Sequence, residues 1–299
     1  MEMKTNDIFD LRRFGKYFAS DIRTCCANYG LSLLTISVLL PFIVYVIPTA
    51  LNLILKSSWD GPDTGLRFFI FVMAMFCIIV TMPVKCYGKI TEKQYGTFWL
   101  TLPSSKLEKF ISMVIMTCII APITGVVLYL GMDAIICALD HSCGNSLIAG
   151  AIEWLKNLGN LKEVTVNLVN EHLEIENAAM AQEIVKQLSS PMLYIDEIFC
   201  LTLPFLLGAI FFKNGKTVKT FLVLFAFSTA VSIAMTPVMT SWTNDILTNL
   251  GNSDDKALIT SLFGSGLFKH MVLIDTISDT MMNAALLAGI WFRIKTLKH

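Results

Sequence analysis

Residues 31–53 read LSLLTISVLLPFIVYVIPTALNL and carry no charge along their whole length. A helix needs about 20 consecutive, mostly apolar residues to cross the hydrocarbon core of a bilayer, because no water is present there to satisfy backbone groups. This stretch is long enough, and the uncharged region around it extends from residue 24 to residue 55. It therefore predicts a first membrane-spanning helix.

Five further stretches resemble the first in length or in lack of charge. They are residues 68–84, 110–132, 198–212, 220–240 and 273–292. The fourth span is short unless it begins near Tyr194, and the sixth must accommodate Asp275 and Asp279. Core helices of a soluble protein are the alternative interpretation, but the charge-free runs of nearly membrane length argue against it.

The composition of the chain agrees with a membrane protein. Of the 299 residues, 15% are charged, whereas a soluble domain carries about 25%. Basic and acidic residues balance at 23 each, which argues against a nucleic-acid-binding protein. The apolar content excludes disorder, and eight cysteines are too few for a secreted disulfide scaffold. We predict an all-α polytopic membrane protein with six transmembrane helices.

Lysines and arginines are distributed unevenly between the two sides that six spans define. The side holding both termini carries 16 of them, and the other side carries 7. Because Lys-rich and Arg-rich loops stay in the cytoplasm, we expect both termini to be cytoplasmic. The first span follows five basic residues and lacks a small-residue cleavage pattern, so we do not expect a cleaved signal peptide. These features suit a bacterial cytoplasmic (inner) membrane.

Residues 1–30 have the pattern of an amphipathic helix. One face is apolar and comprises Ile8, Leu11, Phe14, Phe18 and Ile22. A second face is basic and comprises Arg12, Lys16 and Arg23. An apolar stripe beside a basic face is typical of a helix that lies against anionic lipid headgroups. We predict a cytoplasmic interface helix, with a helix packed only on protein as the alternative.

Two long segments lie on the predicted outer side. Spans one to three occupy residues 31–137 and spans four to six occupy residues 192–299, which leaves an acidic segment at 138–191. Its periodicity fits both strand and helix in part, and we expect a small, mostly helical outer subdomain. The second segment, 241–271, contains an apolar stretch that is too short to cross. It predicts a re-entrant or interfacial helix, with an ordinary surface helix as the alternative.

Catalytic, metal-binding and cofactor motifs are not evident. The motif NGKT at 214–217 ends like a phosphate-binding loop, but its first glycine would fall at Ile210 and a span precedes it where a strand is required. No histidine pair or CxxC pair has metal-ligand spacing. We predict no enzyme activity, no metal and no cofactor in this chain. The sequence leaves open a disulfide between Cys137 and Cys143 on the outer side.

Five acidic residues lie near the outer ends of spans three, four and six. They are Asp133, Asp196, Glu197, Asp275 and Asp279. Acids at membrane depth are costly and often functional, so these residues form a candidate polar pathway. Three interpretations stay open: acids that reach outer water, a proton or cation path, and a polar lining for an exported substrate.

The loop at residues 85–109 carries the most informative pattern outside the spans. Pro103 is followed by Ser104 and Ser105, with Glu108 nearby, which predicts the start of a helix with a hydroxyl cap. We expect Gly96 to interrupt the helix formed by the loop residues before Pro103. The pattern therefore predicts two short helices with a bend between them.

Three strings in this loop are EKQYGT at 92–97, LTLPSS at 100–105 and LEK at 107–109. They resemble the loop between spans two and three of exporter-type (type 2) ABC transporter permeases, which are six-span membrane subunits. That family commonly shows an acidic–basic pair, Gly-Thr, a leucine-rich stretch, Leu-Pro with small polar residues, and a late Lys. The layout is similar over nearly the whole chain, including the interface helix and short helices between spans five and six.

The resemblance implies a permease subunit whose energy comes from a separate ATPase chain. In the family this loop contacts the ATPase, so a coupling role is implied for Glu92, Gly96, Thr97, Leu102, Pro103, Ser104 and Glu108. The implied partners are a soluble ABC ATPase subunit, a second permease chain (identical or not) and the lipid bilayer. Closure of the ATPase dimer would then tilt the spans between inward-facing and outward-facing states.

The chain departs from the family in two places. The connection between spans three and four exceeds 50 residues, where the family has a short one, and Lys93 stands where Arg is common. The long connection favours a membrane-embedded sensor, immunity or assembly protein that acts through its outer segment. An ion-coupled secondary transporter is a further alternative to export.

Overall fold

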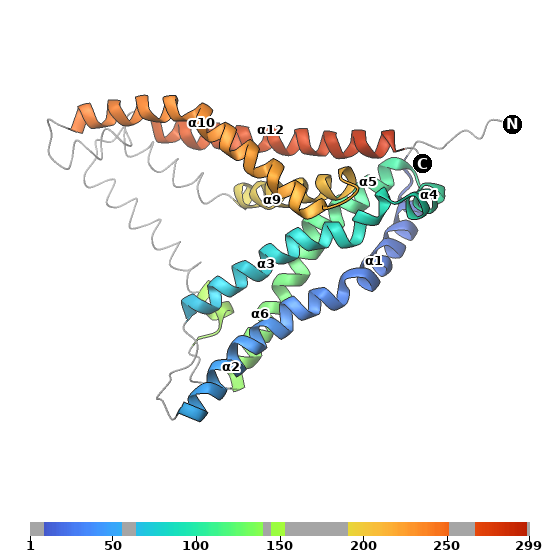
Figure 1. Cartoon of the computed structure of the whole chain (residues 1–299), viewed down its shortest axis with the longest axis horizontal. Helices are drawn as coiled ribbons and strands as arrows, with labels where there is room; N and C mark the ends of the chain where they lie inside the picture. The colour runs from blue at the N-terminus through green and yellow to red at the C-terminus, as the bar shows by residue number, and fades with distance from the viewer. Residues whose placement is uncertain (1–8, 56–63, 140–144, 153–190, 251–266, 298–299) are drawn as a thin grey trace. The chain divides into compact units, whose positions relative to one another are not determined.

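The computed structural model describes residues 9–55, 64–139, 145–152, 191–250 and 267–297, and every regular element within them is helical. The chain divides into two compact units. The first contains residues 1–152, 201–220 and 285–299, and the second contains residues 153–200 and 221–284. The order of the helices along the chain can be followed in Figure 1.

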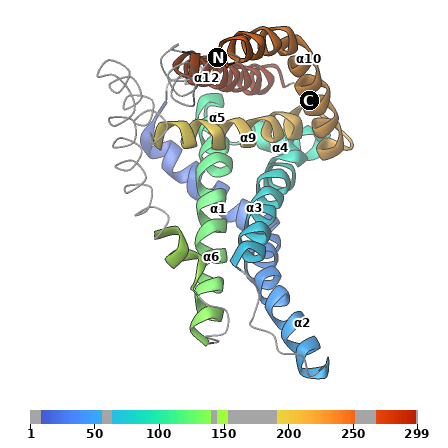
Figure 2. The ribbon, with the colours of Figure 1, turned by 90° about the vertical axis from the view of Figure 1, so that its left-hand side faces the viewer.

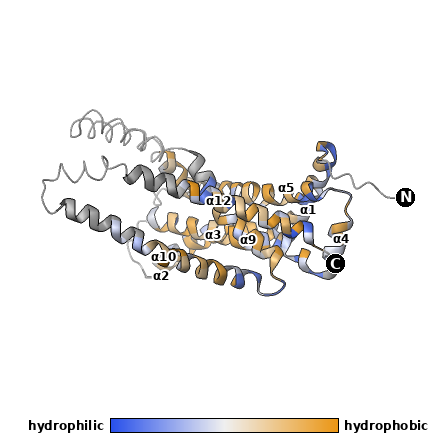
Figure 3. Cartoon of the chain, turned by 90° about the horizontal axis from the view of Figure 1, so that it is seen from above, coloured by the Kyte–Doolittle hydropathy of each residue, from blue (hydrophilic) through white to orange (hydrophobic). Residues whose placement is uncertain are grey.

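Four helices in the described part of the chain are long and apolar enough to cross a membrane. They are Leu11–Leu51, Thr64–Thr91, Lys106–Leu139 and Lys216–Pro237. They coincide with the first, second, third and fifth predicted spans, so the all-helical membrane architecture is confirmed to that extent. The fourth and sixth predicted spans lie in helices α9 (Pro191–Phe211) and α12 (Leu267–Thr296). Figure 3 shows the hydrophobic residues along α3 and α9.

Several predicted features fall on residues outside the described part of the chain. Most of the outer segment 138–191 does so, as do Cys143 and residues 257–266, which hold nearly all of the short apolar stretch predicted within 241–271. Within the outer segment the structure describes residues 145–152, which include a helical turn.

The first span is the continuation of the predicted interface helix. Helix α1 (Leu11–Leu34) passes through a π-helical turn, η1 (Thr35–Leu39), into α2 (Leu40–Leu55) without a break. The boundary expected at residues 30–31 is therefore absent. No proline occurs before Pro41, so nothing interrupts the backbone hydrogen-bond ladder there.

The third span also consists of two α-helices joined by a π-helical turn. Helix α5 (Lys106–Ile115) passes through a π-helical turn, η3 (Met116–Ile120), into α6 (Ala121–Leu139). A proline stands two residues after each turn, at Pro41 and at Pro122. A proline ring clashes with the carbonyl four residues earlier, and a π-helical turn widens the helix at that carbonyl. Proline placement therefore explains both turns.

The core of the first unit lies between α2, α6 and the second span, α3 (Thr64–Tyr87). Ala74, Tyr129 and Leu147 form a buried cluster, and the rings of Phe71 and Tyr129 meet edge to face at 5.2 Å. Figures 1 and 2 both show α3 and α6 side by side. A side chain at Gly125 of α6 would meet Ile78 of α3 at 2.8 Å, so a glycine is required for this close approach.

A second close approach joins α9 to the first turn of α10 (Lys216–Leu250). A methyl group on Gly208 would overlap the hydroxyl and Cβ of Thr220, and both residues are buried. We expect Gly208→Ala to lower the free energy of unfolding by about 1–3 kcal/mol, as overpacking of a core does. Unfolding of the purified chain in detergent measures this change.

Two controls accompany this measurement. Gly131→Ala adds a methyl group where no atom lies within 4 Å. It should leave stability unchanged or raise it by up to about 1 kcal/mol, because alanine is the better helix former. The double variant Gly208→Ala with Thr220→Ala removes the overlapping hydroxyl but keeps the Cβ of residue 220, which lies 2.9 Å from the added methyl group, and it should recover part of the loss. Wild-type stability in Gly208→Ala alone would contradict the close packing.

Candidate functional site

The segment at residues 88–109, here called the connecting segment, joins the second and third candidate spans. It begins with a 3-10 turn, η2 (Gly88–Thr91), followed by helix α4 (Lys93–Thr101) and the start of α5. The expected break at Gly96 is wrong, because Gly96 lies inside α4 and its N–H donates to the carbonyl of Glu92 at 2.8 Å. The chain bends instead between Leu102 and Ser105, where Pro103 disfavours helix at the preceding residue.

The start of α5 confirms the predicted hydroxyl cap. The Ser105 hydroxyl accepts from the N–H of Glu108 at 3.2 Å, and the Glu108 carboxylate accepts from the N–H of Ser105 at 2.9 Å. This reciprocal pair is a capping box, which satisfies two backbone donors at the helix start. Helix α5 then continues into the third span, so only α4 is a short helix as predicted.

Glu108 also joins the connecting segment to α1. Its carboxylate, which is fully buried, accepts from the Arg13 guanidinium at 2.7–3.0 Å and from the N–H of Asp10 at 3.0 Å. The buried charge is therefore neutralised, as burial of a carboxylate requires. The sequence singled out Glu108, whereas its partners 95 and 98 positions away were not predicted.

Two further contacts with α1 involve residues that the sequence did not single out. The indole N–H of Trp99 donates to the Tyr17 hydroxyl at 3.2 Å. The Asp21 carboxylate accepts from the hydroxyls of Tyr87 and Ser112, which belong to α3 and α5. Tyr17 and Asp21 are four residues apart, so they share one helical face. That four-residue spacing was the only feature of the sequence that could have indicated these contacts.

Helix α4 has two different faces. Gly96 and Trp99 are buried, whereas Gln94, Thr97, Phe98 and Thr101 are exposed. Phe98 is 62% exposed. The exposed positions follow the i, i+3, i+4, i+7 spacing of one helical face.

The phenol of Tyr95, in the same helix, stays neutral at physiological pH. Burial raises its pKa, and the nearby Asp21 carboxylate acts in the same direction.

The residues predicted to couple to an ATPase are thus distributed over both faces and the bend. Glu92, Thr97 and Pro103 are exposed, Leu102 and Ser104 are half-buried, and Gly96 and Glu108 are buried. The Ser104 hydroxyl is buried without a hydrogen-bond partner. Phe98 is the large exposed residue that the sequence did not select.

Basic side chains in this part of the first unit donate to carbonyls at helix ends. Lys216 donates to the Gly88 carbonyl after α3, Arg293 to the Ile210 carbonyl of α9, and Lys106 to the Lys295 carbonyl of α12. The last carbonyls of a helix lack partners within it, and a cation at that end also interacts favourably with the helix dipole. Lys216 of the NGKT motif therefore has a role in helix capping.

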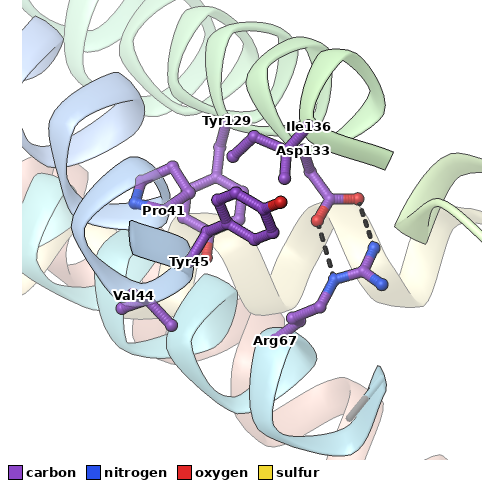
Figure 4. Close-up of a pocket in the computed structure, with 7 residues that line it drawn as sticks. All are labelled: Pro41, Val44, Tyr45, Arg67, Tyr129, Asp133 and Ile136. Atoms are coloured by element: carbon purple, nitrogen blue, oxygen red, sulfur yellow. Dashed lines mark hydrogen bonds and ion pairs between the residues drawn. The ribbon is translucent and has the colours of Figure 1, made fainter. Parts of the chain in front are cut away.

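Asp133, the first acid of the candidate pathway, is buried against Arg67. The Arg67 Nε and Nη2 atoms donate to the two carboxylate oxygens at 2.9 and 2.8 Å, as Figure 4 shows. The N–H of Leu147 donates to the same carboxylate at 2.8 Å. Asp133 therefore joins α3, α6 and the turn at 145–152, and does not face outer water.

The cavity beside this pair is small. It has a volume of about 10 Å³ and is lined by the pair and by Pro41, Val44, Tyr45, Tyr129 and Ile136. A cavity of roughly this volume holds about one water molecule. It does not accommodate a transported molecule in this conformation.

The other four acids belong to the second unit. Asp196 and Glu197 lie on α9, and Asp275 and Asp279 lie on α12, where the side chain of Asp275 is outside the described residues. The backbone carbonyl of Asp196 accepts from the Asn283 side chain at 3.0 Å. This contact brings the part of α9 around Asp196 beside α12 within the unit.

The two faces of the connecting segment differ in exposure and in their contacts. One face of α4 is exposed and carries an aromatic side chain, and the other face is hydrogen-bonded to α1. Among the described residues, no group of three or more metal-binding side chains is present. Comparison of the chain with protein-family models, curated protein sequences and solved structures finds no match in any of the three.

Proposed function

We propose that this chain is the permease subunit of an exporter-type ABC transport system and that α4 is the contact for its ATPase subunit. The observation that carries the proposal is the division of α4 into an exposed face around Phe98 and a buried face held by α1. A helix that transmits movement needs both: a surface for the partner and a firm attachment to the spans. The resemblance of residues 92–109 to the coupling loop of that family supports the same assignment.

The attachment of α4 leads directly to two spans. Trp99 contacts α1, and Glu108 joins the start of α5 to Arg13 of α1. Helices α1 and α5 continue through their π-helical turns into the first and third spans. Movement of α4 would therefore reach both spans through continuous helices.

The complete assembly that we propose has six spans per chain, both termini in the cytoplasm and a second permease chain. The 16 basic residues on the side of the termini support this orientation. Ion-coupled transport is less well supported, because Asp133 is neutralised by Arg67 in a bidentate ion pair. The outer segment 138–191 keeps a sensor or assembly role as the competing proposal.

The first test is purification of the tagged full-length chain in mild detergent, followed by mass spectrometry of stoichiometric partners. We expect a soluble subunit with nucleotide-binding motifs. Phe98→Ala should weaken its retention at least about tenfold, since buried aromatic anchors dominate interface energies.

Phe68→Ala is the matched control. Phe68 is 57% exposed and lies on α3, away from the connecting segment in sequence, so its replacement should leave retention unchanged. Recovery of the chain without an ATPase, or equal retention in both variants, would count against the proposed function.

A further inference from the structure

Lys109 is a buried cation whose contacts are backbone carbonyls. Its side chain is 2% exposed. Its ammonium donates to the carbonyls of Trp99, Leu100 and Leu102 at 2.7, 3.3 and 3.2 Å, and lies 4.9 Å from the centre of the Trp99 ring. The neighbouring carboxylate of Glu108 is bound to Arg13 instead. Within the described residues, Lys109 therefore has no carboxylate in ion-pair contact.

Two of these carbonyls, those of Trp99 and Leu100, belong to the last turn of helix α4. The third follows the helix at Leu102, where it also accepts from the N–H of Ser104. The last carbonyls of any helix lack an N–H from the next turn. Here a single ammonium group satisfies two of them and places a positive charge at the negative end of the helix dipole. Hydrogen bonds to the carbonyls offset the cost of burying the charge.

Helix α4 has little else to stabilise it locally. It spans nine residues, receives no side-chain cap from Glu92, and has no basic residue in its own last turn. Helices this short are marginal on their own, and Gly96 and Thr97 are weak helix formers. The stability of its last turn therefore depends on tertiary contacts, which include those of Lys109 and the hydrogen bond from Trp99 to Tyr17.

We infer that Lys109 is the positioning residue for the exposed face of α4. The ammonium binds both the carbonyl and the ring of Trp99, so it determines which side of the last turn points inward. Phe98 and Thr101 are consequently held outward. The consequence for ATPase binding rests on the proposed function, whereas the effect on α4 does not.

The variant that tests this inference is Lys109→Met, which keeps the stem and removes the ammonium. Lys106→Met is the matched control, because Lys106 is exposed and donates to the carbonyl of Lys295 instead. Hydrogen exchange of the full chain in detergent reports on α4 directly. We expect exchange in α4 to rise about tenfold in Lys109→Met, the change that loss of buried hydrogen bonds brings, with α3 and α6 unaffected. The control should match wild type.

Retention of the ATPase subunit is the second measurement. It should fall in Lys109→Met although Phe98 is intact. Unchanged exchange over α4 in Lys109→Met would overturn the inference. If α4 loosens but wild type itself retains no ATPase, the proposed function fails and the positioning role stands.

A second variant covers the case in which Lys109→Met does not fold. Lys109→Gln keeps hydrogen-bond donors and removes the charge. We expect the folded variant to lose protection over α4 by several-fold, since hydrogen bonds from a charged donor are the stronger ones. Wild-type protection of α4 in Lys109→Gln would overturn the inference.

Discussion

Replacing Asp133 with Asn is expected to destabilise the first unit by about 3–5 kcal/mol, because it leaves a buried guanidinium without its counter-charge. The side chains of Arg67 and Asp133 are only 6% and 7% exposed, and two hydrogen bonds join them. Arg67 also donates to the carbonyl of Asn145 at 3.2 Å, which does not neutralise it. Denaturant unfolding of the full chain in detergent measures the loss.

Two comparisons distinguish loss of the pair from loss of an acid in general. Glu197→Gln removes an exposed acid of α9 and should have little effect. The double variant Arg67→Met with Asp133→Leu removes both charges, and it should be much less damaging than either single change. A single variant as stable as wild type would show that the pair does not hold α3 and α6 together.

The second large effect is expected at Glu108. Glu108→Ala leaves the Arg13 guanidinium and the N–H groups of Asp10 and Ser105 without their shared acceptor. We expect a loss of about 2–4 kcal/mol, below the range for a fully buried pair because Arg13 is 27% exposed and can reach water. Hydrogen exchange should rise in the first turns of α1, which lose their attachment to α5.

Arg12→Met is the control for this variant. Arg12 precedes Arg13 but is exposed, so removing its charge should leave both stability and exchange unchanged. If Glu108→Ala and Arg12→Met behave alike, the carboxylate does not join α1 to the connecting segment. The proposed transmission from α4 to the first span would then lose one of its two contacts.

The membrane character of the chain could be predicted from the sequence, because the hydrocarbon core of a bilayer requires a run of consecutive apolar residues. A span is recognised by about 20 consecutive residues, with no knowledge of what packs against it. Runs 31–53, 68–84, 110–132 and 220–240 are of about this length and overlap the four candidate spans. The cap at Ser105 is local in the same sense, since Ser105 and Glu108 are three residues apart.

Two residues of the connecting segment carry local signals that interrupt a helix. Gly96 and Pro103 were both expected to do so, Pro103 by preceding a new helix start at Ser105 and Gly96 by a break. The structure places the break at 102–105, because a glycine costs a helix only about 1 kcal/mol whereas proline also excludes helix at the residue before it. The continuation of α1 into the first span is a similar case, since no residue near position 30 forces an end.

Tertiary structure alone decided which charged residues meet. Sequence analysis singled out Asp133 and Glu108 as acids, but their partners Arg67 and Arg13 lie 66 and 95 positions away. Such pairs form because packing of helices brings the two side chains into one space with little water, where neither charge is stable alone. The amino-acid sequence by itself therefore determined which segments are apolar enough to enter a membrane, since that property is a sum over neighbouring residues. Pairing of charges depends on distances between helices, and only the folded arrangement sets those distances.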